Sequence, residues 1–465
     1  MNANIRIYIA LAICVVSTEL RAQSVLPDAP QVHTTLLAST QATPPLVPPL
    51  PAPAEGTPTP LTRQQAEQIA LTNNPRVRIS QLIARIQHQA VRERRAGELP
   101  NLSGNLTAVT ANTGSRISSG YLTASSLLEH AGMGVQLNQL ITDFGRTRNL
   151  VASAQLQEKA RTADAEASRQ DIVLATDQVF FAAIEAQETL QVALQTVSAR
   201  QTITDQVSAL TSSKLRSDLD LSFAQVNLSQ AKLLQLNAQN NLDAAKAALS
   251  AVLGYDKQMN FQLVDDEESL PPLPASSEAL IAQAMQNRPD LQSLQFNELA
   301  ARKFSKAQHE QLLPTISALG VVGGTPMGSS QYFTTNWYGA VGGNVSIPIF
   351  NGFRFSAQAS QATLQAQAAT EETRAVRELV VRDVQTAWLN ANTALQRVTV
   401  TTELLKQANT ALDLAKTRYD LGLSSIVELS QAELQQTEAA IGNANARSQY
   451  DFAISTINFQ TGVQP

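Results

Sequence analysis

The sequence predicts a mainly α-helical protein that also carries membrane β-strands, arranged as a duplicated half-repeat. Three observations support this fold class. Ala, Gln, Ser, Thr and Leu dominate a chain of 465 residues in which 16% are charged and 5% aromatic, a composition that suits long helices. Two stretches of 69 residues, 143–211 and 353–421, contain no proline. Each stretch follows a segment in which apolar and polar residues alternate, as they do in strands.

Residues 1–22 are expected to be an export signal. Arg6 is followed by an apolar run at 7–16 and then by small residues, with a cleavage site after Ala22. Leu20 is larger than the residue usual at its position before the cut, so the cleavage site stays open. The apolar run is too short to span a bilayer, which takes about 20 residues.

The only cysteine, Cys14, lies inside this expected signal, so the mature chain would carry out no thiol or disulfide chemistry. Lipid attachment at Cys14 is disfavoured because the bulky Ile13 precedes it. Residues 23–60 are rich in proline and are expected to form an extended spacer without a packed core. The folded part is expected to begin near Leu61.

The chain repeats itself with a long period. "ALTNNPRVRISQL" at 70–82 resembles "AMQNRPDLQSLQF" at 284–296, an offset of 214 that falls to 208 after the next loops. Each half then contains a helix, a strand pair, a very long helix and a shorter helix. The expected divisions are a first repeat at 61–260, a linker at 261–275 and a second repeat at 276–465.

The long helix of the second half shows a heptad pattern. Two series of residues seven apart keep one stripe of the helix facing a partner helix and favour supercoiling. Subtracting 208 finds a weaker version of the same stripe in the first half. The two series are Val384, Ala391, Val398, Leu405, Leu412 and Tyr419, and Val380, Ala387, Ala394, Thr401, Ala408 and Ala415. A helix of this length is on the order of 100 Å long.

Four segments are expected to be strands, at about 99–111, 131–141, 312–323 and 336–349. The last places Trp337, Val341 and Val345 on one face, and small or polar residues on the other. Strands of about 10 residues with one apolar face are typical of a membrane barrel. A water-soluble sandwich is the alternative, but it would need more than four strands.

Four strands cannot close a barrel. An open strand edge in lipid would leave backbone N–H and C=O groups unpaired. The chain is therefore expected to share a barrel with other copies of itself, and three copies would supply twelve strands. A fibrous coiled coil would explain the helices but not the strands.

These features together resemble the TolC family of outer-membrane efflux ducts over about 61–462. The resemblance rests on the repeat, on the junctions "DFGRTR" and "NGFRFS", and on "RYDLGLSSIVEL" at 418–429. It implies a homotrimer whose twelve-stranded β-barrel continues into a long α-helical barrel. It also implies the outer membrane of a Gram-negative bacterium, contact with its lipid, and a large periplasmic part. Each strand-to-helix junction would then mark where a membrane strand becomes a tunnel helix.

The junction residues singled out are Asp143, Gly145, Asn351 and Gly352, with Asp143 expected as a helix cap. At the far end of the helices, the resemblance implies a closed aperture. Glu428 takes a position where the family places an acidic ring, and Gln431 stands where a second acidic residue is frequent. Three Glu428 carboxylates around one axis would repel one another and attract cations.

Asp220 and Tyr419 match positions of a polar network that ties the tip shut. The basic partner expected near Ser424 is missing, which indicates a weaker or a different fastening of the tip. Gly422 can end the long helix. Lys214, Leu215, Gly422 and Leu423 lie at the paired tips, where an adaptor hairpin could contact them; ordinary exposed turn residues are the alternative.

The sequence offers no credible catalytic set, so no enzyme activity is expected. His33, His88, His130 and His309 are scattered without metal spacing, and no cofactor or metal is expected. The acidic run "DDEES" at 265–269 falls in the inter-repeat linker. A net charge of −5 without a basic cluster argues against nucleic-acid binding.

Three functions are compatible with these features. The first is a passive exit duct for drugs and other small molecules, opened by a periplasmic adaptor and an inner-membrane transporter of RND, ABC or MFS type. The second is the outer-membrane channel of a type I protein secretion system. The third, a periplasmic structural coiled coil or adaptor, explains neither the strands nor the duplication. The cargo and the pump class stay open.

Overall fold

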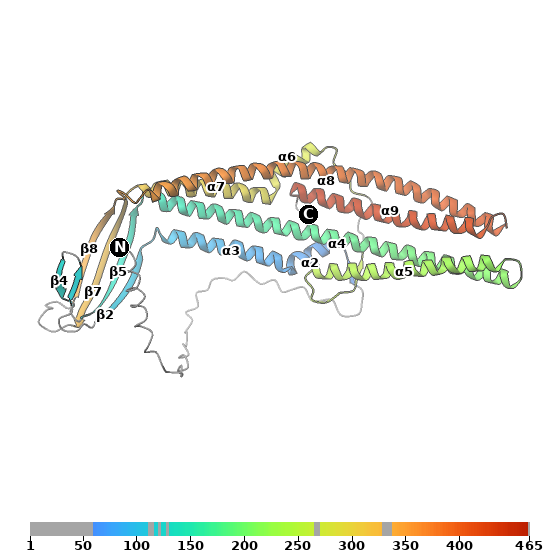
Figure 1. Ribbon diagram of the computed structural model, residues 1–465, viewed down its shortest axis with the longest axis horizontal. Coiled ribbons are helices and arrows are strands. Elements are labelled where there is room, and N and C mark those ends of the chain that lie inside the picture. The colour runs from blue at the N-terminus through green and yellow to red at the C-terminus, as the bar shows by residue number, and fades with distance from the viewer. Residues whose placement is uncertain are drawn as a thin grey trace, which may run out of the picture. The chain divides into compact units, whose positions relative to one another are not determined.

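The computed structural model describes residues 59–109, 116–119, 122–126, 130–264, 270–327 and 337–463 (Figure 1). These residues all belong to one compact unit. The expected export signal and nearly all of the expected proline-rich spacer lie outside the described residues, as does the acidic run at 265–269.

Two helices of 67 residues each dominate the unit. They are α4 (Arg146–Ser212) and α8 (Arg354–Asp420), which begin 208 positions apart and have the same length. Each is about 100 Å long at 1.5 Å per residue. No proline interrupts either helix, as the sequence predicted. No described helix is both long enough and apolar enough to cross a membrane.

A four-stranded antiparallel sheet precedes the long helices. Its order is β2 (Asn101–Val109), β5 (His130–Thr142), β7 (Thr315–Met327) and β8 (Trp337–Ser346). The two repeats meet where β5 pairs with β7, with Val135 opposite Val322. A separate short hairpin joins β3 (Arg116–Ser119) to β4 (Leu122–Ser126).

The observed register agrees with the alternation seen in the sequence. Leu102 lies opposite Leu137, and Val341 lies opposite Gly320, so the apolar positions line up on one face. That face is uncovered, and Leu106 and Val341 are 85% and 92% exposed. The third strand begins later than expected: Leu312 ends a short 3₁₀ turn at Glu310–Leu312, and β7 begins at Thr315 rather than at about 312. Pro314, two residues after that turn, cannot donate a helical hydrogen bond.

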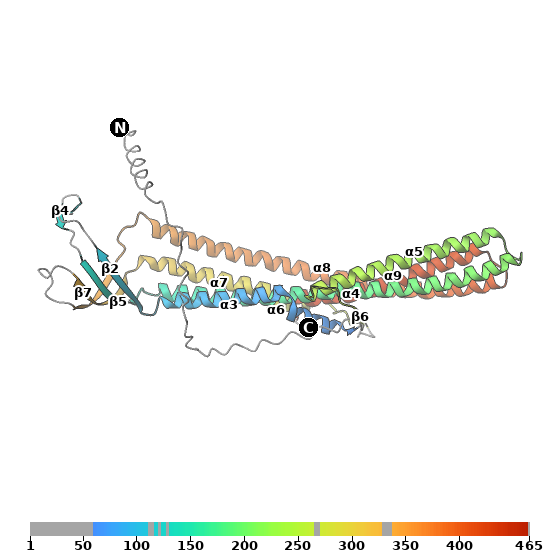
Figure 2. The ribbon, with the colours of Figure 1, turned by 90° about the horizontal axis from the view of Figure 1, so that it is seen from below.

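Shorter helices flank different parts of the long ones (Figures 1 and 2). Toward the sheet, α3 (Pro75–Ala96) packs on α4, and α7 (Pro289–His309) packs between α4 and α8. Toward the far end, α5 (Asp218–Val252) pairs with α4, and α9 (Ile426–Thr461) pairs with α8 and α4. The helix pairs α4–α5 and α8–α9 therefore form two long hairpins that contact each other.

The heptad stripe predicted for α8 is the surface that is buried. All twelve of its residues are buried or half-buried, and so are the twelve residues found in α4 by subtracting 208. Ala387, Ala391, Ala408 and Ala415 are among the buried ones. Small side chains in the seam allow the helices to approach closely.

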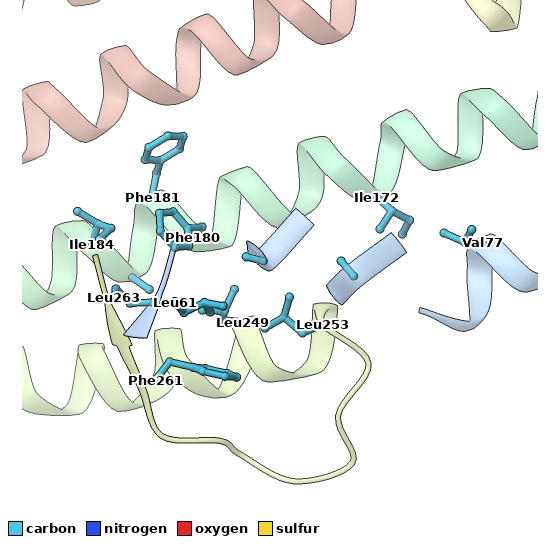
Figure 3. Close-up of a cluster of buried hydrophobic side chains, with 13 residues drawn as sticks. Leu61, Val77, Ile172, Phe180, Phe181, Ile184, Leu249, Leu253, Phe261 and Leu263 are labelled. Carbon is cyan, nitrogen blue, oxygen red and sulfur yellow. The ribbon is translucent and has the colours of Figure 1, made fainter. Parts of the chain in front are cut away.

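The largest apolar cluster lies midway along the helices (Figure 3). It contains Phe180 and Ile184 of α4 together with Leu249 and Leu253 of α5. Helix α2 (Arg63–Asn73) also packs on α4, while α6 (Ser277–Asn287) packs on α8 and α9.

Two short strands contribute to this cluster. They also change the expected boundaries of the proline-rich spacer and of the linker between the repeats. Strand β1 (Thr59–Leu61) pairs in parallel with β6 (Phe261–Leu263), placing Leu61 beside Leu263. Leu61, Phe261 and Leu263 are all buried. Thr59 and Pro60 are thus strand rather than spacer, and the start of the expected linker belongs to the core. The alternation at 261–263 spans three residues, too few to reveal a strand from sequence.

Candidate functional site

The far ends of the two hairpins share one turn geometry. After α4, Lys214 has φ 60° and Leu215 N–H donates to the Leu210 carbonyl. After α8, Gly422 has φ 70° and Leu423 N–H donates to the Arg418 carbonyl. This bond, with a left-handed residue just before its donor, is the Schellman ending of a helix. Lys214 and Gly422 are 208 apart, so the duplication extends to the tips.

Side chains then cap the returning helices. Ser217 and Asp220 form a capping box at the start of α5, with Asp220 accepting from Ser217 N–H. Ser425 accepts a hydrogen bond from Glu428 N–H at the start of α9. Each cap satisfies a backbone N–H that has no partner within the helix. The Asp220 carboxylate is therefore used within its own helix.

Glu428 lies on the exposed side of the second tip. Its Oε1 is 3.2 Å from Arg418 Nε, and the two side chains are 46% and 56% exposed. A pair exposed to this extent contributes at most about 1 kcal/mol to stability. Gln431 is exposed in the next turn of α9. The Glu428 carboxylate, expected to take part in an acidic ring, thus has a cation of its own chain beside it.

Tyr419 is the central side chain of the tip. It is buried, and Arg216 from the turn between α4 and α5 lies 4.7 Å from its ring centroid. Burial raises the pKa of the Tyr419 hydroxyl; the charge of Arg216 opposes the rise, and Asp220 and Asp420 add to it. The hydroxyl is buried and has no hydrogen-bond partner among the described residues.

Apolar contacts surround this ring. Tyr419 belongs to a buried cluster that also contains residues from all four helices at the tip. Its members include Val207, Ala224, Ile426 and Leu429. The two hairpins are therefore joined at the tip by packing and by one cation–π contact, which contributes about 1 kcal/mol or more.

A buried polar layer joins the hairpins farther from the tip. Arg200 of α4 donates to the Asn227 carbonyl of α5 at 2.8 Å, and its Nε lies 3.8 Å from Glu433 Oε2 of α9. Asn227 Nδ2 also donates to Ser430 Oγ of α9 at 2.7 Å. Burial raises the pKa of Glu433, which Arg200 and Lys416 oppose. The layer links three helices.

The prediction from sequence identified some residues of the tip and missed others. It singled out Asp220 and Tyr419, which lie near each other but are not hydrogen-bonded to each other in the described structure. It missed Arg216, which contacts Tyr419, and Arg418, which pairs with Glu428. The available signal was that Arg216 lies four positions before Asp220 and that Arg418 is next to Tyr419 in the sequence. It also missed Arg200, which breaks the apolar stripe of α4.

Ser424, near which a basic partner was expected, has a buried hydroxyl that bonds to no group in the part of the chain that the structure describes. The cations of this tip come from neighbouring positions instead. Leu215 and Leu423 are 72% and 67% exposed at equivalent places in the two turns. Lys214 and Gly422, in the same two turns, are exposed as well.

At the opposite end, both junctions combine two left-handed residues with a polar side chain. Phe144 and Gly145 have φ 56° and 107°, and Gly352 and Phe353 have φ 64° and 63°. Gly145 and Phe353 are the N-cap residues, so the expected N-cap position of Asp143 was wrong.

Asp143 nevertheless stabilises the start of α4. Its Oδ2 accepts from Thr147 N–H at 2.7 Å, and its Oδ1 accepts from Gly145 N–H. Asn351 takes the equivalent place and accepts from Phe355 N–H at 3.4 Å. The two left-handed residues place the N-cap residue two positions after the polar side chain. The amino-acid sequence alone does not reveal this shift.

Within the described part of the chain, no three His, Cys, Asp or Glu side chains form a group that could hold a metal ion. His88 instead lies 2.7 Å from Glu158, which pairs it across α3 and α4.

Comparison with known proteins gives consistent matches. The family model described as "Outer membrane efflux protein" matches residues 67–255 and 280–463. Outer membrane protein TolC of Escherichia coli is 24% identical over 415 residues, covering 86% of this chain and 81% of TolC. Outer membrane efflux protein BepC of Brucella suis is 26% identical over 397 residues, covering 83% and 82%.

Solved structures share the fold. The CmeC outer membrane channel of Campylobacter jejuni aligns with a TM-score of 0.73 and 18% identity, covering 86% of this chain and 85% of CmeC. The open state of the MtrE outer membrane channel of Neisseria gonorrhoeae aligns with a TM-score of 0.72 and 19% identity, covering 86% and 89%.

Proposed function

Since the chain belongs to the outer membrane efflux protein family and lies in the outer membrane, we propose that three copies form a passive exit duct for small molecules. Each copy supplies four strands to a shared barrel and four long helical segments to a tunnel. The duct carries cargo outward when a periplasmic adaptor and an inner-membrane transporter open it. No catalytic step is required of this chain.

One observation carries the proposal: the sheet has an uncovered apolar face and two open edges, β2 and β8. The apolar face matches the lipid of the outer membrane. Open edges in lipid are unfavourable because their backbone groups lack partners, so β8 of one copy would pair with β2 of the next. The polar face, with Asn344 and Ser346, would then line the enclosed space.

The tips would form the closed aperture. In three copies, Glu428 and Gln431 would surround one axis. The contact between Tyr419 and Arg216 would hold each protomer's hairpins together, while Asp220 would cap α5 beside it. The exposed turn residues Leu215 and Leu423 would meet the adaptor. Their 72% and 67% exposure supports this role, since large apolar side chains at a tip invite a partner.

The mass of the detergent-extracted full-length protein tests the shared barrel. Native mass spectrometry should find three copies per particle. A monomeric particle that retains its helical circular dichroism would contradict the proposal, because four strands cannot close by themselves.

The same duct could serve a type I protein secretion system. Cross-linking in cells, with a photoreactive residue at Leu423, would identify the adaptor bound to the tip. An adaptor that also binds a secretion ATPase would favour the secretion role, and one bound to a drug transporter would favour efflux.

A further inference from the structure

A polar cleft of about 450 Å³ lies where β7 and β8 meet the first turns of α4 and α8. Figure 1 shows these elements converging at the sheet end of the long helices. The polar lining includes Arg146, Arg354, Gln311, Gln358, Thr315 and Ser346. The volume is within the range of sites for small ligands, about 300–1,000 Å³.

Two arginines at equivalent positions face this cleft. Arg146 and Arg354 are each the first residue of a long helix, 208 positions apart. A cation is unfavourable there, because the N-terminus of a helix already carries partial positive charge. An arginine at the start of each helix therefore opposes the usual preference for acidic residues at helix N-termini. Such unfavourable placements concentrate at functional sites.

Neither arginine has a carboxylate partner among the described residues. Arg146 Nε is buried, and no described group forms a hydrogen bond with it. The neighbouring carboxylates bind other groups: Asp143 accepts from Thr147 and Gly145, and Glu310 accepts from Asn149 Nδ2 at 2.8 and 2.9 Å. The guanidinium charges in the cleft are thus available to an anion.

The remaining lining indicates the kind of anion. Arg354 lies 5.0 Å from the ring centroid of Phe355, which limits the orientations of its guanidinium group. Phe355, Leu313 and Pro348 add apolar walls to the same cleft. A ligand with an apolar body and a charged head would contact both the apolar walls and the arginines. An inorganic anion would contact only the arginines.

The cleft lies on the polar side of the sheet. Thr315 and Ser346 are opposite each other in the register and alternate with Ile316 and Val345, which belong to the apolar face. In the proposed duct, the polar side faces the enclosed space and not the lipid. The ligand would therefore be a solute in the duct.

We propose that this cleft binds organic anions, with Arg146 and Arg354 holding a carboxylate, sulfonate or phosphate group. The site rests on the proposed duct and names a substrate class for it. Three copies place six guanidinium groups around the waist between strands and helices. Arginine suits this task because its planar fork donates two parallel hydrogen bonds to such groups.

Binding of the anionic dye fluorescein to the purified full-length protein in detergent tests the cleft. Fluorescence polarisation should report saturable binding that weakens at least tenfold in each of Arg146→Gln and Arg354→Gln, since each variant removes a charge-assisted hydrogen bond to the anion. Excess benzenesulfonate should compete. The cationic dye rhodamine 6G should not bind saturably.

Arg148→Gln is the matched control, because Arg148 is exposed in the first turn of α4 but does not line the cleft. It should leave binding unchanged. If a glutamine variant fails to assemble, Arg146→Lys and Arg354→Lys keep the charge and should lose affinity partially. Wild-type protein without saturable binding, or an equal loss in Arg148→Gln, would overturn the proposal. These binding measurements do not depend on whether the protein conducts. Recordings in planar bilayers would therefore test the duct separately.

Discussion

Two acidic side chains are buried side by side between α2 and α4. Glu67 and Asp177 are 7% and 4% exposed, and Arg63 lies 3.8 Å from each of them. Burial and the charge of Asp177 raise the pKa of Glu67 to about 7, which Arg63 opposes. Burial also raises the pKa of Asp177, while Ser455 of α9, Glu67 and Arg63 lower it. The pair therefore favours one shared proton.

This pair makes stability depend on pH. The folded chain binds a proton more tightly than the unfolded chain, so stability should fall as pH rises from 4.5, the ordinary pKa of Glu67, to about 7. Glu67→Gln should flatten that slope and raise stability above pH 7 by about 2 kcal/mol, since one pKa unit corresponds to about 1.4 kcal/mol and Asp177 shares the proton.

Urea unfolding followed by circular dichroism at several pH values measures both effects. Glu93→Gln, at an exposed position of α3, is the control and should leave the slope unchanged. A slope that persists in Glu67→Gln would show that other groups cause it.

Glu428 is the residue that should set ion preference at the aperture. Glu428→Gln should reduce the cation preference of single channels by roughly twofold or more, because a ring of carboxylates concentrates cations. Glu438→Gln, at an exposed position farther along α9, serves as the control. Equal reversal potentials for wild type and Glu428→Gln would contradict the proposed acidic ring.

The turns at the two tips differ at one left-handed position. Gly422→Ala should cost about 1 kcal/mol, because a residue with a Cβ atom is strained at φ 70°. Lys214→Gly should be neutral or slightly stabilising, because it removes the same strain at φ 60°. Thermal unfolding of both variants measures the difference, and a larger loss from Lys214→Gly would contradict this account of the turns.

The hairpins should depend on their buried polar layer. Arg200→Leu leaves Glu433 buried without its nearest cation and should destabilise the protein by about 3 kcal/mol. Replacing both residues by leucine should recover most of that loss. A double variant as unstable as Arg200→Leu alone would show that the pairing with Glu433 is unimportant.

The elements that sequence predicted well are the periodic ones. A heptad sustained from Val380 to Tyr419 can place only one stripe of α8 against a partner, and that stripe is buried. Strand alternation likewise predicted which face of β8 is apolar. The pair β1–β6 could not be predicted, because three-residue strands have no measurable period.

The contacts of the candidate site depended on tertiary structure. Arg216 and Tyr419 are 203 positions apart, and only the packing of the two hairpins brings them within 4.7 Å. Glu67 and Asp177 resemble ordinary surface carboxylates in sequence, and only the docking of α2 on α4 buries them. The sequence shows that Arg146 and Arg354 are equivalent positions of the repeat. It does not show that neither arginine has a carboxylate partner among the described residues.

At the scale of the whole molecule, the duplication explains the architecture. Both repeats supply two strands, one 67-residue helix and one shorter returning helix, and β5 pairs with β7 to join them. The sheet is left with open edges, so the chain alone is incomplete as a membrane structure. The proposed assembly from several copies would pair these edges.

The conductance of single channels in planar bilayers tests the central claim most directly. Wild-type protein should give small, uniform steps. Arg216→Gln/Asn227→Ala should give larger steps, because it removes two contacts between the hairpins. Folded, three-copy protein that conducts in neither form would contradict the account of this chain as an exit duct.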